Sequence, residues 1–340
     1  MDRLPVLRHG HTTDLEYDQS PSKRDQMTIA GHSIPEEILW ILAVIFGVLL
    51  SCSAIIYLLR QRRDTSLLKE IHLRVWSWWR IAIGVAVVIA GPPWMGALLI
   101  AYISFVAMRE MFSIGQLRGA DRAGIFAAYL AIPVQYFLAW HFYFEQFLYF
   151  IPMAMFIVIP VLLVLNGRMN QIGRSMSIIP AILMLTAYMP SHMVLLYRLP
   201  VQPHPAGAGG LLIFLIMLTA FNDVFQFTWG KLLGKHKILP YVSPNKTWEG
   251  FVGGILTTSC LGMILSFLTP LLWWQACITG FVVGLTGFLG DSIISAIKRD
   301  LRLKDTDDLI PGHGGAMDRL DSILITAPFY FYLIKYFAGI

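Results

Sequence analysis

The stretch EILWILAVIFGVLLSCSAIIYLL, residues 37–59, carries a single charged side chain, at its first position. A helix needs about 20 mostly apolar residues to cross the hydrocarbon core of a bilayer, so this stretch predicts a membrane-spanning helix. Apolar types make up 56% and charged types 14% of the 340 residues, whereas a typical soluble domain is about 25% charged. The composition therefore predicts an all-α integral membrane protein. No small-residue cleavage site follows this first apolar run, so we expect it to be a retained anchor.

Further apolar runs continue along the chain and predict a polytopic helical bundle of about ten transmembrane helices. The tripeptide Gly91-Pro92-Pro93 divides the second run from the third, because consecutive prolines interrupt a helix. The predicted spans are residues 37–59, 81–92, 94–108, 123–140, 146–166, 176–197, 210–230, 250–269, 272–293 and 321–338.

Basic residues gather in alternate connections between these spans. Lys and Arg are enriched in cytoplasmic loops, so the pattern predicts an outside N-terminus and a cytoplasmic face where the polar motifs lie. The net charge of +5 then reflects orientation, and no nucleic-acid partner is expected. The three cysteines fall inside apolar runs and match no metal or disulfide pattern. The basic connections are 60–80, 109–122, 167–175, 231–247 and 298–319.

Asn222-Asp223 lies within the seventh span. An ionisable residue inside a span is costly and by default indicates a functional site. The alternative is a structural ion pair with a lysine from a neighbouring helix.

The segment GKLLGKHKILPYVSPNKTWEG, residues 230–250, combines lysines with glycines. Ser243-Pro244 is typical of an N-cap followed by proline at the first helical position, which predicts a helix from Asn245. Its free N–H groups would suit a phosphate. Lys246 and Glu249 would share a face of that helix. The alternative is a basic loop that binds lipid headgroups.

The segments GDSIISAIKRD (290–300) and KDTDDLIPGHGGAMDRLDS (304–322) hold the densest charge. If the ninth span continues as a helix, Asp291, Ser295, Lys298 and Arg302 form one polar stripe at the cytoplasmic face. Asp318 and Asp321, three residues apart, share a face at the start of the tenth span.

This mixture of side chains suits metal-bound polyphosphate. Aspartate oxygens suit magnesium, lysine and arginine neutralise phosphates, and glycines admit oxyanions close to the backbone. His313 is interpreted as either a structural hydrogen-bonding residue or a phosphate contact. A transporter's ion path would instead spread charges across membrane depth in several spans, whereas most charges here cluster at one face.

The run from Ser295 through Lys298-Arg299, Lys304-Asp305, Pro311 and His313-Gly314-Gly315 to Asp318-Arg319 and Asp321 resembles the signature of phosphatidate cytidylyltransferases (CDP-diacylglycerol synthases). Gly230-Lys231 and SPNKTWEGFVGG resemble a second block of that family. The resemblance spans about 220–325 and is loose over 80–220, where Arg109-Glu110 is similar. Ile294, Asp307, Ala316 and FNDVFQFTWG depart from the usual pattern, which indicates a divergent branch.

The resemblance implies transfer of CMP from CTP to phosphatidate, giving CDP-diacylglycerol and pyrophosphate, with Mg²⁺. A related lipid acceptor, a polyprenol kinase, a transporter and an inactive paralogue remain alternatives. We expect a bacterial inner-membrane protein, with membrane lipids and a second copy of the chain as candidate partners. The predicted organisation is a polar tail (1–36), an additional helix with a basic loop (37–79) and the catalytic membrane domain (80–340). The residues expected in catalysis are Asp223, Asp291, Lys298, Asp318 and Asp321, with the four aspartates as metal ligands, and those expected to bind substrate are Lys231, Ser243, Lys246, Ser295, Arg299, Lys304, His313, Gly314, Gly315 and Arg319.

Overall fold

The computed structural model describes residues 27–29, 32–62, 66–167, 169–199, 204–303 and 315–339. Nearly all of this is helical, which confirms the predicted all-α class. Two short antiparallel ribbons are the exceptions in the described chain: β1 (Met27–Ile29) with β2 (His32–Ile34), and β3 (Lys237–Leu239) with β4 (Ser243–Thr247).

The helices follow in chain order, and two long segments contain an internal π-helical turn. The first half comprises α1 (Glu36–Arg62), α2 (Ser66–Ala90), α3 (Pro93–Ile114), a 3₁₀ turn (Gly119–Asp121), α4 (Arg122–Trp140), and the continuous α5 (Phe144–Tyr149), π turn (Phe150–Met155) and α6 (Phe156–Leu165). The second half comprises the continuous α7 (Ile172–Leu183), π turn (Met184–Tyr188) and α8 (Met189–Leu195), then α9 (Gly207–Leu233), α10 (Trp248–Ile264) with a 3₁₀ turn (Leu265–Leu268), α11 (Trp273–Asp300) and α12 (Met317–Phe337).

These helices form ten segments in the described chain, one at each predicted span. Eight of them are long and apolar enough to cross a membrane, and α2 carries a shorter apolar part, Trp78–Ile89. The break at Gly91-Pro92 separates α2 from α3 as predicted. The expected basic loop 60–80 is wrong, because α1 continues to Arg62 and α2 already begins at Ser66.

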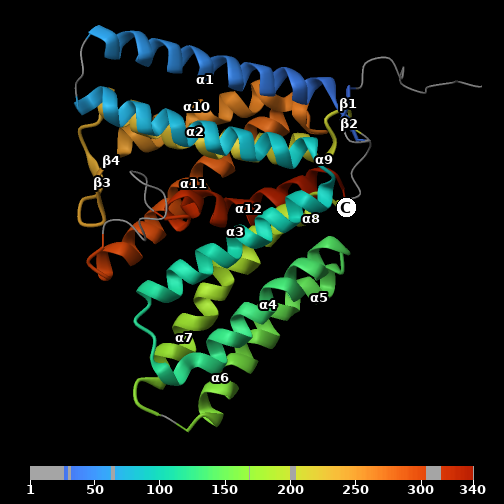
Figure 1. The fold of residues 1–340 in the computed structure, drawn as a ribbon, viewed down its shortest axis with the longest axis vertical. Coiled ribbons are helices and arrows are strands. Elements are labelled where there is room, and N and C mark those ends of the chain that lie inside the picture. The colour runs from blue at the N-terminus through green and yellow to red at the C-terminus, as the bar shows by residue number, and fades with distance from the viewer. Residues whose placement is uncertain are drawn as a thin grey trace, which may run out of the picture.

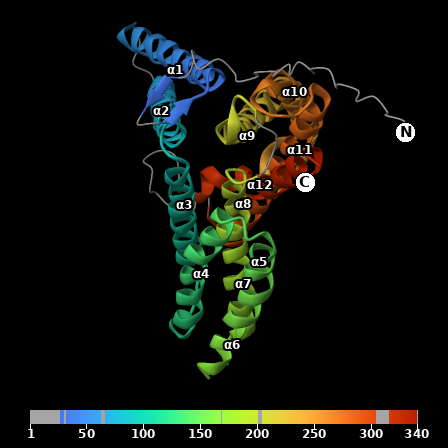
Figure 2. The same cartoon turned by 90° about the vertical axis from the view of Figure 1, so that its right-hand side faces the viewer.

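The C-terminal helices form the centre of the molecule. Helix α10 packs against α9 and α11, and α11 packs against α12. Figures 1 and 2 both show α12 between the group α9–α11 and the bundle of α3–α8. Helix α12 contacts α8 and α3 of that bundle. Helices α1 and α2 lie side by side, and α2 leads into α3 (Figure 1). The start of α12 is thus surrounded by segments from both halves of the chain.

Glycines bring α10 and α11 together. A Cβ at Gly280 of α11 would lie 2.7 Å from the Thr258 carbonyl oxygen of α10, and one at Gly262 would lie 2.5 Å from the Ala276 carbonyl oxygen. Small residues commonly allow such close backbone contact between membrane helices. This contact fixes the position of α11, which carries Asp291 and Lys298 into the region described next.

Candidate active site

Three carboxylates from three helices lie near one another: Asp223 on α9, Asp291 on α11 and Asp321 on α12. They are close enough for their charges to interact. The approach of α11 to α12 requires a glycine, because a Cβ at Gly290 would lie 2.3 Å from the Asp321 carbonyl oxygen. The Ser322 hydroxyl lies 3.2 Å from each Asp223 carboxylate oxygen and joins α12 to α9. Residues predicted from separate motifs therefore meet in one cluster.

Lys246 reaches this cluster from strand β4. Its Nζ lies 2.9 Å from Asp291 Oδ2 and donates a 2.9 Å hydrogen bond to the Ser292 hydroxyl. The ammonium also stands 4.3 Å from the centre of the Phe288 ring. Asp291 Oδ1 accepts a 3.0 Å hydrogen bond from Ser295. Lys246 therefore offsets one of the three clustered negative charges, and the structure brings Lys246, Asp291 and Ser295 together.

A second ion pair joins α11 to α12. Lys298 Nζ lies 2.6 Å from Asp318 Oδ1, and these side chains are 12% and 9% exposed. The Gly315 N–H donates a 3.1 Å hydrogen bond to Asp318 Oδ2. Removing one member of a buried pair leaves an uncompensated charge, so this pair holds the first turn of α12 against α11. Asp318 is paired directly with Lys298, whereas Asp321 lies near Asp223 and Asp291 and also near the Lys298 ammonium.

Glu110 of α3 anchors the start of α12 from the opposite side. Its Oε1 accepts a 2.7 Å hydrogen bond from the Ala316 N–H, and its Oε2 a 2.9 Å hydrogen bond from the Met317 N–H. The residue is 1% exposed. A carboxylate at a helix N-terminus satisfies free N–H groups and favours the helix dipole. Glu110 was not among the residues predicted for the site; its signal was the charged pair Arg109-Glu110 directly after the third predicted span.

Asn222 has a structural role beside Asp223. The residue is fully buried. Its Oδ1 accepts hydrogen bonds from Gln226 at 3.0 Å and Thr258 at 3.2 Å, and its Nδ2 donates to the Gly284 carbonyl at 3.3 Å. Asn222 therefore ties α9 to α10 and α11, and this fixes the position of the neighbouring carboxylate.

The predicted helix start at Ser243 is wrong. Residues Ser243–Thr247 form strand β4, in which Ser243 pairs with Leu239, and α10 begins at Trp248. The N-cap is Thr247, whose hydroxyl accepts a 3.1 Å hydrogen bond from the Gly250 N–H. The backbone of the Ser-Pro segment thus pairs with strand β3, and the observed N-cap lies four residues after the predicted one.

The expected common face for Lys246 and Glu249 is also wrong, since Lys246 lies in the strand. Glu249 turns to the hairpin instead: its Oε1 lies 2.6 Å from His236 Nδ1, and its Oε2 accepts a 3.1 Å hydrogen bond from the Lys235 N–H. Glu249 therefore closes the base of the hairpin that carries Lys246.

Arg299 binds the same hairpin from α11. Its Nε donates a 3.2 Å hydrogen bond to the Val242 carbonyl, and its Nη1 a 3.1 Å hydrogen bond to the Leu303 carbonyl. This gives Arg299 a positioning role. The predicted polar stripe is correct for Asp291 and Lys298 but wrong for Arg302, which follows the end of α11 with a left-handed backbone (φ 57°).

Among the other predicted residues that the structure describes, Lys231, Ser243 and Gly315 lie outside the carboxylate cluster. Lys231 stands at the exposed end of α9, with its ammonium 5.9 Å from the Phe227 ring centre. Ser243 lies on β4, and Gly315 serves as a donor to Asp318. Lys304, His313, Gly314 and the side chain of Arg319 lie outside the described residues.

The oxygen donors of the cluster suit a hard cation such as Mg²⁺. In the ranges that the structure describes, however, no three carboxylate, histidine or cysteine side chains converge closely enough to hold an ion. Asp291 is engaged by Lys246 and Asp223 by Ser322. The donor chemistry thus fits a divalent cation, whereas the present contacts are with protein groups.

Comparison with known proteins places this arrangement in a family. The profile of the cytidylyltransferase family matches residues 72–337. An uncharacterized protein of Escherichia coli (strain K12), YnbB, is 39% identical over 296 residues, which is 87% of this chain and 97% of that protein. The phosphatidate cytidylyltransferase of Mycobacterium leprae is 42% identical over 125 residues, or 36% of this chain and 40% of that enzyme. That of Staphylococcus epidermidis is 36% identical over 119 residues, or 34% of this chain and 46% of that enzyme.

The two kinds of match differ in extent. The alignments with the named enzymes cover less than half of those proteins, whereas the alignment with the uncharacterized relative covers nearly all of it. The family profile spans the described chain from within α2 to the end of α12, including every helix that contributes to the carboxylate cluster. The protein therefore belongs to the cytidylyltransferase family of membrane-bound nucleotidyltransferases.

Proposed function

We propose that the protein transfers CMP from CTP to phosphatidate and releases CDP-diacylglycerol and pyrophosphate. The observation that carries the proposal is the meeting of Asp223, Asp291 and Asp321 with Lys246 near the first turns of α12. The partial similarity to enzymes named phosphatidate cytidylyltransferase supports this choice of acceptor. A lipid headgroup and a soluble nucleotide can meet only near a membrane surface, and the end of the candidate span α11, which carries Asp291 and Lys298, is a suitable place.

In this reaction, a phosphate oxygen of the lipid attacks the α-phosphorus of CTP. A new P–O bond forms to the lipid phosphate, the bond from the α-phosphorus to the β-phosphate oxygen breaks, and pyrophosphate leaves with those electrons. Transfer to phosphorus depends mainly on positioning and charge stabilisation. Lys246 is paired with Asp291 and Lys298 with Asp318, and both lysines would exchange their aspartate partners for phosphate oxygens.

Mg²⁺ is the expected cofactor, and when bound it would neutralise charge on the polyphosphate. Asp223, Asp291 and Asp321 are the proposed ligands, because they come from three helices toward one place. Asp318 remains the predicted fourth ligand; it is paired with Lys298, as Asp291 is with Lys246.

The further assignments remain predictions. Lys231, Lys304, His313, Gly314 and Arg319 are expected to contact CTP or the lipid headgroup. We propose that the site faces the cytoplasm of a bacterial inner membrane, where CTP is available, and that the catalytic domain covers residues 80–340. A homodimer also remains a prediction.

The test follows the fate of two labels. Full-length protein in detergent is incubated with phosphatidate, Mg²⁺ and CTP labelled at either the α- or the γ-phosphate. Cytidylyl transfer moves the α-label into a lipid that migrates as CDP-diacylglycerol, and EDTA abolishes it. A lipid kinase would instead move the γ-label. Folded protein that moves neither label, beside an active control enzyme, would contradict the proposal.

A second candidate is the same transfer to a different lipid phosphate. It is favoured by the short alignments with the named enzymes. Ile294, where the family usually has an acidic residue, is 1% exposed in the apolar core, so this departure removes no carboxylate from the polar cluster. A panel of lipid phosphates with α-labelled CTP distinguishes the acceptors; failure of the whole panel would favour transport or an inactive paralogue.

A further inference from the structure

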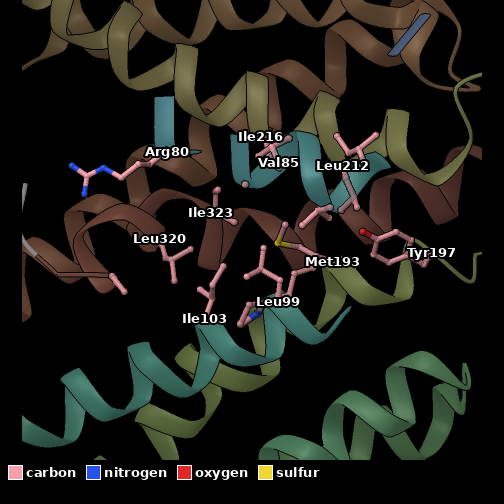
Figure 3. Close-up of a pocket in the computed structure, with 16 residues that line it drawn as sticks. Arg80, Val85, Leu99, Ile103, Met193, Tyr197, Leu212, Ile216, Leu320 and Ile323 are labelled. Carbon is pink, nitrogen blue, oxygen red and sulfur yellow. The ribbon is translucent and has the colours of Figure 1, made fainter. Parts of the chain in front are cut away.

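An apolar cavity of about 410 Å³ lies between α2, α3, α8, α9 and α12 (Figure 3). This volume falls in the range of roughly 300–1,000 Å³ that is usual for small-ligand sites. Side chains such as Val85, Ile103, Met193 and Ile216 line its middle. Three of the lining helices, α3, α8 and α9, belong to candidate membrane spans, so an apolar ligand of this cavity would come from the bilayer.

The two ends of the cavity differ in chemistry. Arg80 is the one charged residue among the sixteen lining positions in the described chain, and its guanidinium points away from the apolar lining (Figure 3). Tyr197 stands at the opposite end (Figure 3). A ligand that matches both features has an anionic head beside Arg80 and an apolar tail that extends toward Tyr197.

The length of the cavity matches one leaflet of a bilayer. Its lining on α2 runs from Arg80 to Ile89, nine residue steps that span about 14 Å of helix. The hydrocarbon core of a bilayer is about 30 Å thick, so half of it is about 15 Å. This is the depth that one acyl chain of a lipid occupies from the headgroup inward.

The cavity also adjoins the carboxylate cluster through α12. Ala316 and Leu320 line it, and the Ala316 N–H is held by Glu110. On the other face of the same turns, Asp318 pairs with Lys298 and Asp321 faces the cluster. A lipid seated here would thus place its headgroup at the start of α12, beside the residues proposed to hold CTP.

We propose that this cavity binds one acyl chain of the lipid phosphate acceptor, with Arg80 beside the lipid's phosphate. The inference rests on the proposed function for the identity of the lipid. The cavity adjoins the carboxylate cluster and has a cation, Arg80, at one end. Both features favour the lipid phosphate acceptor as the ligand, because a bulk membrane lipid would require neither a nearby reaction site nor a cation. The cavity then selects acyl-chain length, because a chain that is too long meets Tyr197.

Gly84 provides a direct test. It lines the cavity, and a Cβ added there would have no neighbouring atom within 4 Å. The Cβ of Gly84→Leu is therefore accommodated without displacing protein atoms, and the rest of the side chain would extend into the cavity. Gly47 on α1 is the matched control, since a Cβ there also meets nothing within 4 Å and the position lies outside the lining.

Turnover is measured with dioctanoyl and dioleoyl phosphatidate at several concentrations. Gly84→Leu should lower kcat/KM for both lipids about tenfold relative to the wild type, the loss expected when about two methylene groups are denied burial, because Gly84 lies about one helical turn from Arg80 and both chains pass it. Gly47→Leu should keep the wild-type kcat/KM for both lipids. Arg80→Gln should raise KM for both lipids, since the headgroup is common to them. Wild-type kcat/KM for both lipids in Gly84→Leu would overturn the inference while leaving the proposed reaction intact.

A binding measurement separates this inference from the reaction itself. A phosphatidate with a photoreactive group near the end of one acyl chain is crosslinked to the full-length protein in vesicles, and the labelled residues are identified by mass spectrometry. Labelling of α8 or α9 near Tyr197 and Leu212, lost in Gly84→Leu and kept in Gly47→Leu, supports the site even if no CDP-lipid forms. Labelling confined to the exposed face of α1 would refute it.

Discussion

Replacing Glu110 by Gln should misplace the start of α12. Within the described chain, one carboxylate oxygen accepts a hydrogen bond from the Ala316 N–H and the other from the Met317 N–H, whereas an amide offers one oxygen and turns an NH₂ group toward the other donor. A hydrogen bond to a charged group contributes about 1.5–3 kcal/mol, and a charge at a helix N-terminus about 0.3–1 kcal/mol. The substitution should therefore weaken this anchor by about 2–4 kcal/mol.

The same change should reduce turnover, because the first turn of α12 carries Asp318 and Asp321. A displacement of about 1 Å in a positioned group can cost about 10²-fold in rate. We expect kcat for lipid labelling by α-labelled CTP to fall by about that factor. Glu110 acts through α12 and not on the substrate directly, so Glu110→Asp, which keeps the charge on a shorter side chain, should recover part of the lost kcat.

The control is Glu145→Gln, the same chemical change at an exposed position in the first turn of α5, which should leave both kcat and thermal stability unchanged. Thermal unfolding of Glu110→Gln is measured in the same detergent. A wild-type kcat in Glu110→Gln would refute the argument that Glu110 anchors the start of α12. Reduced stability with normal kcat per folded molecule would show that Glu110 supports folding without positioning the site.

Three further results are expected. Asp321→Asn should reduce cytidylyl transfer at least about 10²-fold with a thermal midpoint close to that of the wild type; full activity would exclude Asp321 from the site. Lys246→Met should lower stability by leaving Asp291 without its ammonium partner, and Asp291→Asn in the same protein should restore stability but not activity; additive losses in this double-mutant cycle would argue against a direct pair. Gly290→Leu should abolish activity, because even its Cβ would lie 2.3 Å from the Asp321 carbonyl oxygen, and normal turnover would contradict the close contact of α11 with α12.

The helices could be predicted from the sequence because hydrophobic length determines them almost directly. In a protein of this composition, an apolar run as long as 37–59 indicates a membrane-spanning helix and no other structure. Gly91-Pro92-Pro93 divides two helices because proline interrupts the helical backbone locally. The helix expected after Ser243 failed for a non-local reason. Capping rules describe what a Ser-Pro pair can do next to a helix, but here the backbone of this segment pairs with Lys237–Leu239. Thr247 then supplies the cap.

The site was predictable in its composition but not in its pairings. An aspartate inside a span and a dense charged segment beside one both indicate function, because placing charged side chains in apolar surroundings costs free energy. Which lysine meets which aspartate depends on the packing of α9, α11 and α12 through glycine contacts. Glu110 shows the limit most clearly, since its partner Ala316 lies 206 residues away and no local pattern links the two.

The distribution of partners among the buried acids bears on where a cation would bind. A carboxylate inside an apolar bundle is costly unless hydrogen bonds or a counter-charge satisfy it. Asp291 has an ammonium and a hydroxyl, Asp318 has an ammonium and a backbone N–H, and Asp223 has the Ser322 hydroxyl. Asp321, in contrast, accepts within the described chain one hydrogen bond, from the adjacent Ser322 N–H at 2.8 Å, and it lies near two other carboxylates and one ammonium, that of Lys298. Its position is therefore the one where an external cation would relieve the most unbalanced charge, and for this reason Asp321 ranks first among the proposed magnesium ligands.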